Sequence, residues 1–143
     1  MYKRWLKKLP VYSMCYWNKW AFYNILNDSP VIHRKSNTDP LLYSRLIITA
    51  DTETSKGVNT EHNHIVIWSI TISYKDRKIV TLYGRRPSDF VKCLTKIKDN
   101  IPCNRMYIFF HNLGYDWVFL RRFILDQYGK PDYQLNLKPH APL

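Results

Sequence analysis

The side chains best suited to chemistry in this 143-residue chain are acidic ones that follow short apolar runs. Asp51 and Glu53 come directly after the apolar run 46–50. Two positions apart on an extended chain, both side chains point to the same side. Like charges this close repel each other unless a cation lies between them, and carboxylate oxygens are the ligands that Mg²⁺ and Mn²⁺ prefer. Taken alone, however, the pair is more typical of a solvent-exposed acidic turn.

A third acidic residue, Asp116, follows another apolar run, residues 106–110. In an open α/β sheet, ligands bind at the carboxyl ends of the strands, and both acidic groups would lie there if the two strands were neighbours. Asp116 by itself also suits a helix N-terminus, because the helix dipole favours negative charge there. Two acidic groups that each follow an apolar run, in a strongly basic chain, favour a metal ion bridging them to phosphate.

The elements that must position these residues follow from the spacing of apolar residues. The pattern predicts strands at 46–50, 65–74, 78–83 and 106–110, and helices at 87–101 and 114–128. Three neighbouring strands followed by a helix crossover predict an α/β domain with a mixed sheet, in the order β-β-β-α-β-α. No further element is predicted past residue 132, so we expect this domain to be incomplete at its C-terminus.

Residues 1–44 are predicted to form a basic, aromatic extension ahead of a domain that spans residues 45–143. Within the extension, residues 11–26 are expected to be a helix that packs on the domain, because polar residues interrupt an apolar stretch too short to span a membrane. A peripheral contact with a membrane surface is the less favoured alternative. Residues 27–40 are predicted to be a loop, because Asn, Asp, Ser and Pro are concentrated there.

The chain is strongly basic, with 22 Lys and Arg residues against 11 Asp and Glu residues and a net charge of +11. A field of this sign attracts polyanions, nucleic acid first and anionic lipid second. The three cysteines lack Cys-x-x-Cys spacing, so they indicate reduced thiols rather than a disulfide framework or a zinc ribbon. We therefore expect a nucleic-acid-binding protein of the cytoplasm.

Two stretches resemble the exonuclease motifs of family-B DNA polymerases. Residues 51–54 (Asp-Thr-Glu-Thr) are similar to the first motif, and residues 110–116 (Phe-His-Asn-Leu-Gly-Tyr-Asp), followed by Phe119 and Leu120, are similar to the second. The His-Asn-Leu run before an aromatic-Asp pair most resembles the protein-primed polymerases of small phages and linear plasmids. The resemblance covers residues 45–128, and the order and separation of the two motifs are its most specific features.

The resemblance implies an RNase H-like fold and the 3′→5′ proofreading exonuclease site of a DNA-directed DNA polymerase. It implies that Asp51, Glu53 and Asp116 are the catalytic carboxylates and hold two divalent ions, Mg²⁺ or Mn²⁺. In such sites one ion lowers the pKa of the attacking water, and the other stabilises the leaving 3′ oxygen.

The resemblance also implies partners. Thr54, His111, Asn112 and Tyr115 would contact the single-stranded 3′ end of DNA, since uncharged hydrogen bonds and aromatic faces bind a strand without reading its sequence. For Tyr115, packing in the core is the alternative. A terminal, priming protein is a further partner of this family, and residues 1–44 are a candidate surface for it.

The family's third motif, a Tyr and an Asp four residues later, is missing. Tyr128 and Asp132 have this spacing, but Tyr128 lies about 18 Å beyond Asp116 along the same predicted helix. Four residues span at most about 14 Å, too little to bring Asp132 back to a shared ion. We therefore expect the amino-terminal piece of a longer polymerase, or a gene cut short, with little or no activity as an isolated chain.

Other functions remain open at this point. The chain is also compatible with a small standalone nuclease, although a fourth carboxylate for it is not found. A non-catalytic nucleic-acid-binding module of RNase H-like fold is a second alternative. A basic, aromatic, membrane-associated protein with an incidental Asp-x-Glu is a third.

Overall fold

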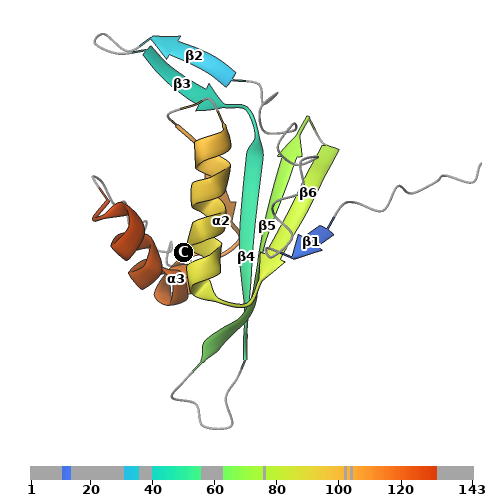
Figure 1. The fold of residues 1–143 in the computed structure, drawn as a ribbon, viewed down its shortest axis with the longest axis vertical. Coiled ribbons are helices and arrows are strands. Elements are labelled where there is room, and N and C mark those ends of the chain that lie inside the picture. The colour runs from blue at the N-terminus through green and yellow to red at the C-terminus, as the bar shows by residue number, and fades with distance from the viewer. Residues whose placement is uncertain are drawn as a thin grey trace, which may run out of the picture.

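In the computed structural model of the chain, a five-stranded sheet carries two helices on one face (Figure 1). The structure describes residues 11–13, 31–35, 40–55, 63–75, 77–101, 103 and 105–131. The strands of the large sheet are β1 (Val11–Ser13), β4 (Ile47–Ser55), β5 (His64–Tyr74), β6 (Arg77–Gly84) and β7 (Ile108–Phe110). The helices are α2 (Pro87–Asn100) and α3 (Leu113–Tyr128), and a separate two-stranded sheet consists of β2 (Val31–Lys35) and β3 (Pro40–Ser44).

The strands of the large sheet lie in the order β1-β6-β5-β4-β7. β4, β5 and β6 form an antiparallel meander, whereas β7 pairs in parallel with β4 and β1 pairs in parallel with β6. α2 connects β6 to β7, as a parallel neighbour of β4 requires a crossover. The predicted α/β class, its mixed sheet and the element order β-β-β-α-β-α are confirmed.

The amino-terminal part differs from its prediction in two places. Val11–Ser13, the start of the predicted helix 11–26, is a strand at the edge of the sheet, because β6 offers it an unpaired edge. The predicted loop 27–40 contains β2, paired antiparallel with β3, where β-branched Val31 and Ile32 favour a strand. Residues 14–30 lie outside the described part of the chain, so the membrane-contact alternative there stays a prediction.

β4 runs on past the predicted strand 46–50 and ends at Ser55. Exposure alternates along it: Ile48, Ala50 and Thr52 are buried against the helices, while the odd-numbered positions between them are exposed. Because side chains of a strand alternate with a period of two, the apolar residues Ile48 and Ala50 fix the face on which each polar residue of β4 lies.

Trp68 of β5 stands at the centre of the core with no exposed surface. Its ring packs edge-on against Phe90 of α2, with 5.5 Å between the ring centroids and 85° between the planes. Its indole N–H donates a 2.8 Å hydrogen bond to the carbonyl of Arg86, at the start of α2. This bond satisfies the one polar atom of a fully buried ring and fixes where α2 begins.

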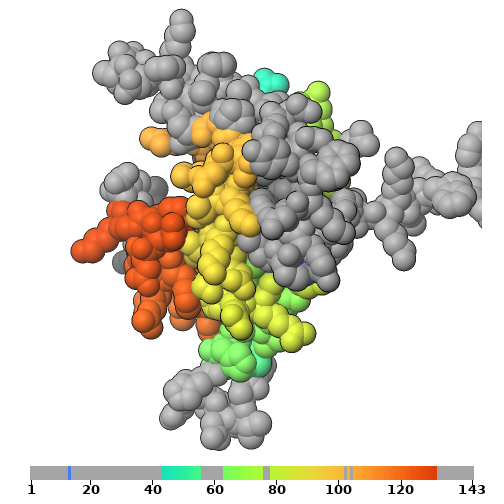
Figure 2. Space-filling view, in the orientation of Figure 1, coloured from blue at the N-terminus to red at the C-terminus, as the bar shows by residue number. Residues whose placement is uncertain are grey.

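The two helices pack side by side, as the space-filling view shows (Figure 2). Near the far end of α3, the hydroxyl groups of Tyr128 and Thr95 form a 2.6 Å hydrogen bond between α3 and α2. Tyr128 is therefore engaged with α2, and Asp132, its partner in the rejected third motif, lies outside the described residues. Within the described part of the chain, no helix is long and apolar enough to cross a membrane.

Cys93 of α2 gives a pH-dependent prediction. The side chain is fully buried, and desolvation raises the pKa of its thiol from 9.0 to about 12, an effect that the positive charge of Lys96 partly offsets. Between these pH values the folded chain keeps the thiol proton and the unfolded chain loses it. The thiol therefore contributes stability that is lost as pH rises through this window, by up to about 1.4 kcal/mol per pH unit.

We expect the urea midpoint of the wild-type chain to fall more steeply between pH 9 and pH 11 than that of Cys93→Ala, both measured by circular dichroism. The variant is the matched control, because other groups that titrate in this range are common to both chains. Parallel slopes would show that the thiol is not protected by the fold.

Candidate functional site

The two motifs meet at the carboxyl ends of β4 and β7. β7 pairs with β4 only as far as Ala50, and the chain then turns through His111 and Asn112 into α3. Beside Asp51–Glu53, the β7 side of β4 therefore has no paired strand among the described residues. Between β4 and β7 the order of the strands along the chain also reverses, and ligands of α/β sheets bind at such a point, outside the carboxyl ends of the strands.

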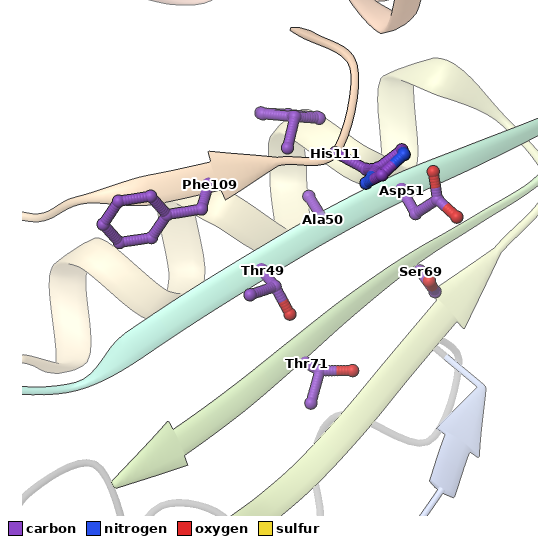
Figure 3. Close-up of a pocket in the computed structure, with 8 residues that line it drawn as sticks. Thr49, Ala50, Asp51, Ser69, Thr71, Phe109 and His111 are labelled. Carbon is purple, nitrogen blue, oxygen red and sulfur yellow. The ribbon is translucent and has the colours of Figure 1, made fainter. Parts of the chain in front are cut away.

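Asp51 and Glu53 lie on the exposed face of β4, opposite the helices. Asp51 and His111 both line a pocket of about 430 Å³ on this face and lie at the same end of it (Figure 3). Hydroxyl groups from β4 and β5 and aromatic residues of β7 also line the pocket. Its other lining residues are Thr49, Ala50, Ser69, Thr71, Phe109 and Phe110. The pocket therefore joins hydrogen-bonding groups, a carboxylate and an aromatic ring on an open sheet face.

Asp116 lies in the first turns of α3 and is only 2% exposed. Its carboxylate accepts a 2.5 Å hydrogen bond from the hydroxyl of Thr52, which is itself buried. Thr52 faces the helices, so Asp116 approaches β4 from the face opposite to that of Asp51 and Glu53. None of the ion pairs between described residues includes Asp116.

The three carboxylates thus reach the same segment of β4 but from two sides. Among the described residues, no group of three His, Cys, Asp or Glu side chains is arranged to hold a metal ion. Carboxylate oxygens suit Mg²⁺ or Mn²⁺ in their chemistry, yet in this arrangement they do not form the site. The roles of Asp51, Glu53 and Asp116 as metal ligands and catalytic groups stay predictions.

The residues predicted to contact DNA gather at the start of α3. The hydroxyl groups of Tyr115 and Thr54 form a 2.5 Å hydrogen bond that joins the two motifs directly. The Tyr115 ring contacts Phe119 edge-on, at 5.2 Å between centroids, but remains 43% exposed. Packing in the core, the alternative predicted for Tyr115, therefore describes only part of this ring. Much of the ring remains accessible.

His111 and Asn112 are both exposed in the turn between β7 and α3. Asn112 is the N-cap residue of α3, and its carbonyl accepts hydrogen bonds from the amides of Tyr115 and Asp116. The Asn112 side chain makes no capping hydrogen bond. The side-chain amide of Asn112 therefore does not cap the helix, and Asn112 is exposed at the surface where Tyr115 lies.

Thr52 is the residue of this site that sequence reasoning missed. It stands inside the first motif, between the two acids, and no role for it was predicted from the sequence. The signal was present in the alternation of β4, because a residue between two exposed positions must face the helices. A hydroxyl group on that face needs a hydrogen-bond partner, and Asp116 supplies it.

The chain was compared with protein-family models, with curated proteins and with solved structures, and none of these matches it. The resemblance to the polymerase exonucleases accordingly rests on the two motifs, their order and their separation.

Proposed function

We propose that this chain is the amino-terminal exonuclease portion of a protein-primed, family-B DNA polymerase, and that it belongs to the 3′→5′ proofreading site of the full-length enzyme. The observation that carries the proposal is the direct contact between the two motifs. Thr52 and Thr54 each bond a residue of the second motif, Asp116 and Tyr115, which lie 64 and 61 positions further along the chain. Because these residues are far apart in the sequence, their contacts depend on the tertiary fold and not on local structure.

The sheet topology supports the finer assignment to an RNase H-like fold. β4, which carries Asp51 and Glu53, lies between the antiparallel strand β5 and the parallel strand β7, and β7 leads into the helix with Asp116. These are the two elements on which the resemblance to the polymerase exonucleases implies the catalytic acidic residues.

The surface features support a single-stranded DNA end as the substrate. The net charge of +11 attracts a polyanion, and the exposed Tyr115 ring offers a face on which a base can stack. Asp51 and Glu53 are exposed on β4, past the point where β7 stops pairing with it, and no described strand pairs with that side of β4. Mg²⁺ or Mn²⁺ is the implied cofactor, and a terminal protein is the implied partner in priming.

A non-catalytic nucleic-acid-binding module of the same fold is the second candidate. The observation that favours it is the burial of Asp116 against Thr52, which leaves the described residues without a three-carboxylate group. Both candidates share the DNA-binding surface, and they differ in whether Asp51 contributes to the binding of a divalent ion.

Titration with Mn²⁺, followed by isothermal calorimetry, distinguishes the two candidates. We expect weak binding by the wild-type chain, at least tenfold weaker binding by Asp51→Ala, and unchanged binding by Asp126→Asn. Asp126 is the matched control, because it is an exposed acid near the end of α3, and its ion pair with Arg122, at 4.0 Å on the surface, contributes little. Equal binding by wild type and Asp51→Ala would contradict the exonuclease proposal.

Two further observations bear on the same proposal. The genomic sequence just downstream should continue into a polymerase that carries the third exonuclease motif. The isolated chain should degrade single-stranded DNA poorly or not at all, because Asp116 is turned away from the other two acids. Vigorous Mn²⁺-dependent trimming of a single strand by this chain alone would contradict that expectation.

A further inference from the structure

Three aromatic side chains, Tyr43, Tyr107 and Phe109, form a continuous row along β7, which we call the aromatic row. The Tyr43 and Tyr107 rings lie 5.9 Å apart between centroids, with 16° between their planes, and the Tyr107 and Phe109 rings lie 6.4 Å apart with 25°. Tyr43 is half-buried, whereas Tyr107 and Phe109 are each 53% exposed. Exposed aromatic side chains that gather in this way mark a surface for interaction, and nearly parallel rings suit other flat groups.

The aromatic row leads into the pocket of the candidate site. Phe109 lies opposite Thr49 in the pairing of β7 with β4, and Asp51 lies two residues further along β4 on the same face. Phe109 lines the pocket at the end opposite to Asp51 and His111 (Figure 3). The pocket volume of about 430 Å³ is within the range of small-ligand sites, so it suits a group as large as one nucleotide.

The other end of the aromatic row is basic. Tyr43 forms an isolated backbone bridge with Arg105, and Arg45 follows Tyr43 by two residues. Both arginine residues are exposed. The segments that carry the three rings, residues 43–49 and 105–110, contain no acidic residue. Cationic side chains attract phosphate groups, and aromatic faces stack with bases, so this end of the row is complementary to a nucleic-acid strand.

We propose that the aromatic row is the track of the single DNA strand behind its 3′ terminus. The terminal nucleotide occupies the pocket beside Asp51, the bases before it stack on Phe109 and Tyr107, and Tyr43 supports Tyr107 from behind. The proposal rests on the proposed function, because it places the 3′ terminus at Asp51. Every base has an aromatic face, so such a track binds a strand without reading its sequence. A protein partner would also fit exposed rings, but the arginine residues and the absence of acidic ones favour a polyanion.

Fluorescence anisotropy with labelled octathymidine, at low salt and without divalent ions, tests the track. Tyr107→Ala combined with Phe109→Ala should weaken binding by about 100-fold, because two stacking positions are lost. The exchange of Tyr107→Phe with Phe109→Tyr keeps both rings and should bind within about twofold of wild type. Tyr128→Ala removes an exposed ring from the far end of α3 and should leave binding unchanged.

Photocrosslinking of the wild-type chain tests the same point even if the double alanine variant does not fold. We place 5-iodouracil at the second or third nucleotide from the 3′ end of the strand and identify the crosslinked residues by mass spectrometry. Phe109 and Tyr107 should be the residues modified, and 5-iodouracil at the 5′ end should modify neither. Crosslinks that avoid both residues at every position would overturn the track.

The outcomes separate the two proposals. A loss of octathymidine binding in Tyr115→Ala, with no loss when Tyr107 and Phe109 are both replaced by alanine, overturns the track and leaves the proposed function standing. A double variant that keeps octathymidine binding but loses self-association in sedimentation velocity also overturns the track, because the row would then be a contact between copies of the chain. Binding of Mn²⁺ that is independent of Asp51, with octathymidine binding that depends on the row, contradicts the proposed function and supports the row as the surface of a nucleic-acid-binding module.

Discussion

Replacing Gly84 by alanine is expected to lower the free energy of unfolding by about 3 kcal/mol, because the new methyl group would overlap a core ring that cannot move aside. A Cβ at Gly84 would lie 2.5 Å from Cζ2 and 2.7 Å from Cε2 of Trp68. This ring is fully buried, bonded through its indole N–H to Arg86 and packed edge-on against Phe90. Urea denaturation followed by tryptophan fluorescence measures the loss.

Gly114→Ala is the matched control for this substitution. Gly114 lies in the first turn of α3, where a Cβ would meet only the Asn112 side-chain oxygen, at 3.7 Å. Alanine also has the higher helix propensity, so we expect a stability equal to that of wild type or greater by up to about 1 kcal/mol. If Gly84→Ala were as stable as Gly114→Ala, the close approach of β6 to Trp68 would be refuted.

The elements that the sequence predicted correctly are those whose apolar spacing is regular. The helix predicted at 87–101 is α2, with Phe90, Leu94 and Ile97 buried at helical intervals. β4 was predicted too short because its second half is polar, and a run such as Asp51–Ser55 is typical of a loop. The structure continues the strand because the eleven-residue β5 pairs with it as far as Ser55, a long-range partnership that no local pattern encodes.

The candidate site could be predicted in part for the same reason. A period of two places Asp51 and Glu53 on one face, and the exposure along β4 agrees. The face from which Asp116 approaches depends on how α3 packs, which is decided by the burial of Leu120 and by the neighbouring α2. That packing joins residues distant in sequence, so the contact with Thr52 emerges only from the fold.

The strands of the amino-terminal part show another limit of local patterns. β1 is only three residues long and forms by pairing with the edge of β6. In the same way, β2 forms by pairing with β3. Short strands carry little periodicity of their own. Their prediction requires knowing which edges of the sheet are free, and this follows only from the complete topology.

Truncating Tyr115 to alanine is expected to weaken the binding of a short oligothymidine by about 30-fold at low salt, because stacking of one base on an aromatic ring contributes about 2 kcal/mol. The ring is 43% exposed at the start of α3, next to the exposed Asn112. Low salt is required because phosphate contacts of a basic protein weaken steeply as salt rises. Fluorescence anisotropy without divalent ions measures binding apart from any hydrolysis.

Two substitutions separate stacking from the other interactions of this residue. Tyr115→Phe keeps the ring and removes only the hydroxyl that bonds Thr54, so it should bind within about twofold of wild type if stacking dominates. Tyr128→Ala removes a ring of nearly the same exposure, 42%, from the opposite end of α3 and should leave oligothymidine binding unchanged. A loss in Tyr115→Phe as large as that in Tyr115→Ala would assign the effect to the hydroxyl and its bond to Thr54. Equal losses in Tyr115→Ala and Tyr128→Ala would place the DNA-binding surface away from the end of α3 where the two motifs meet.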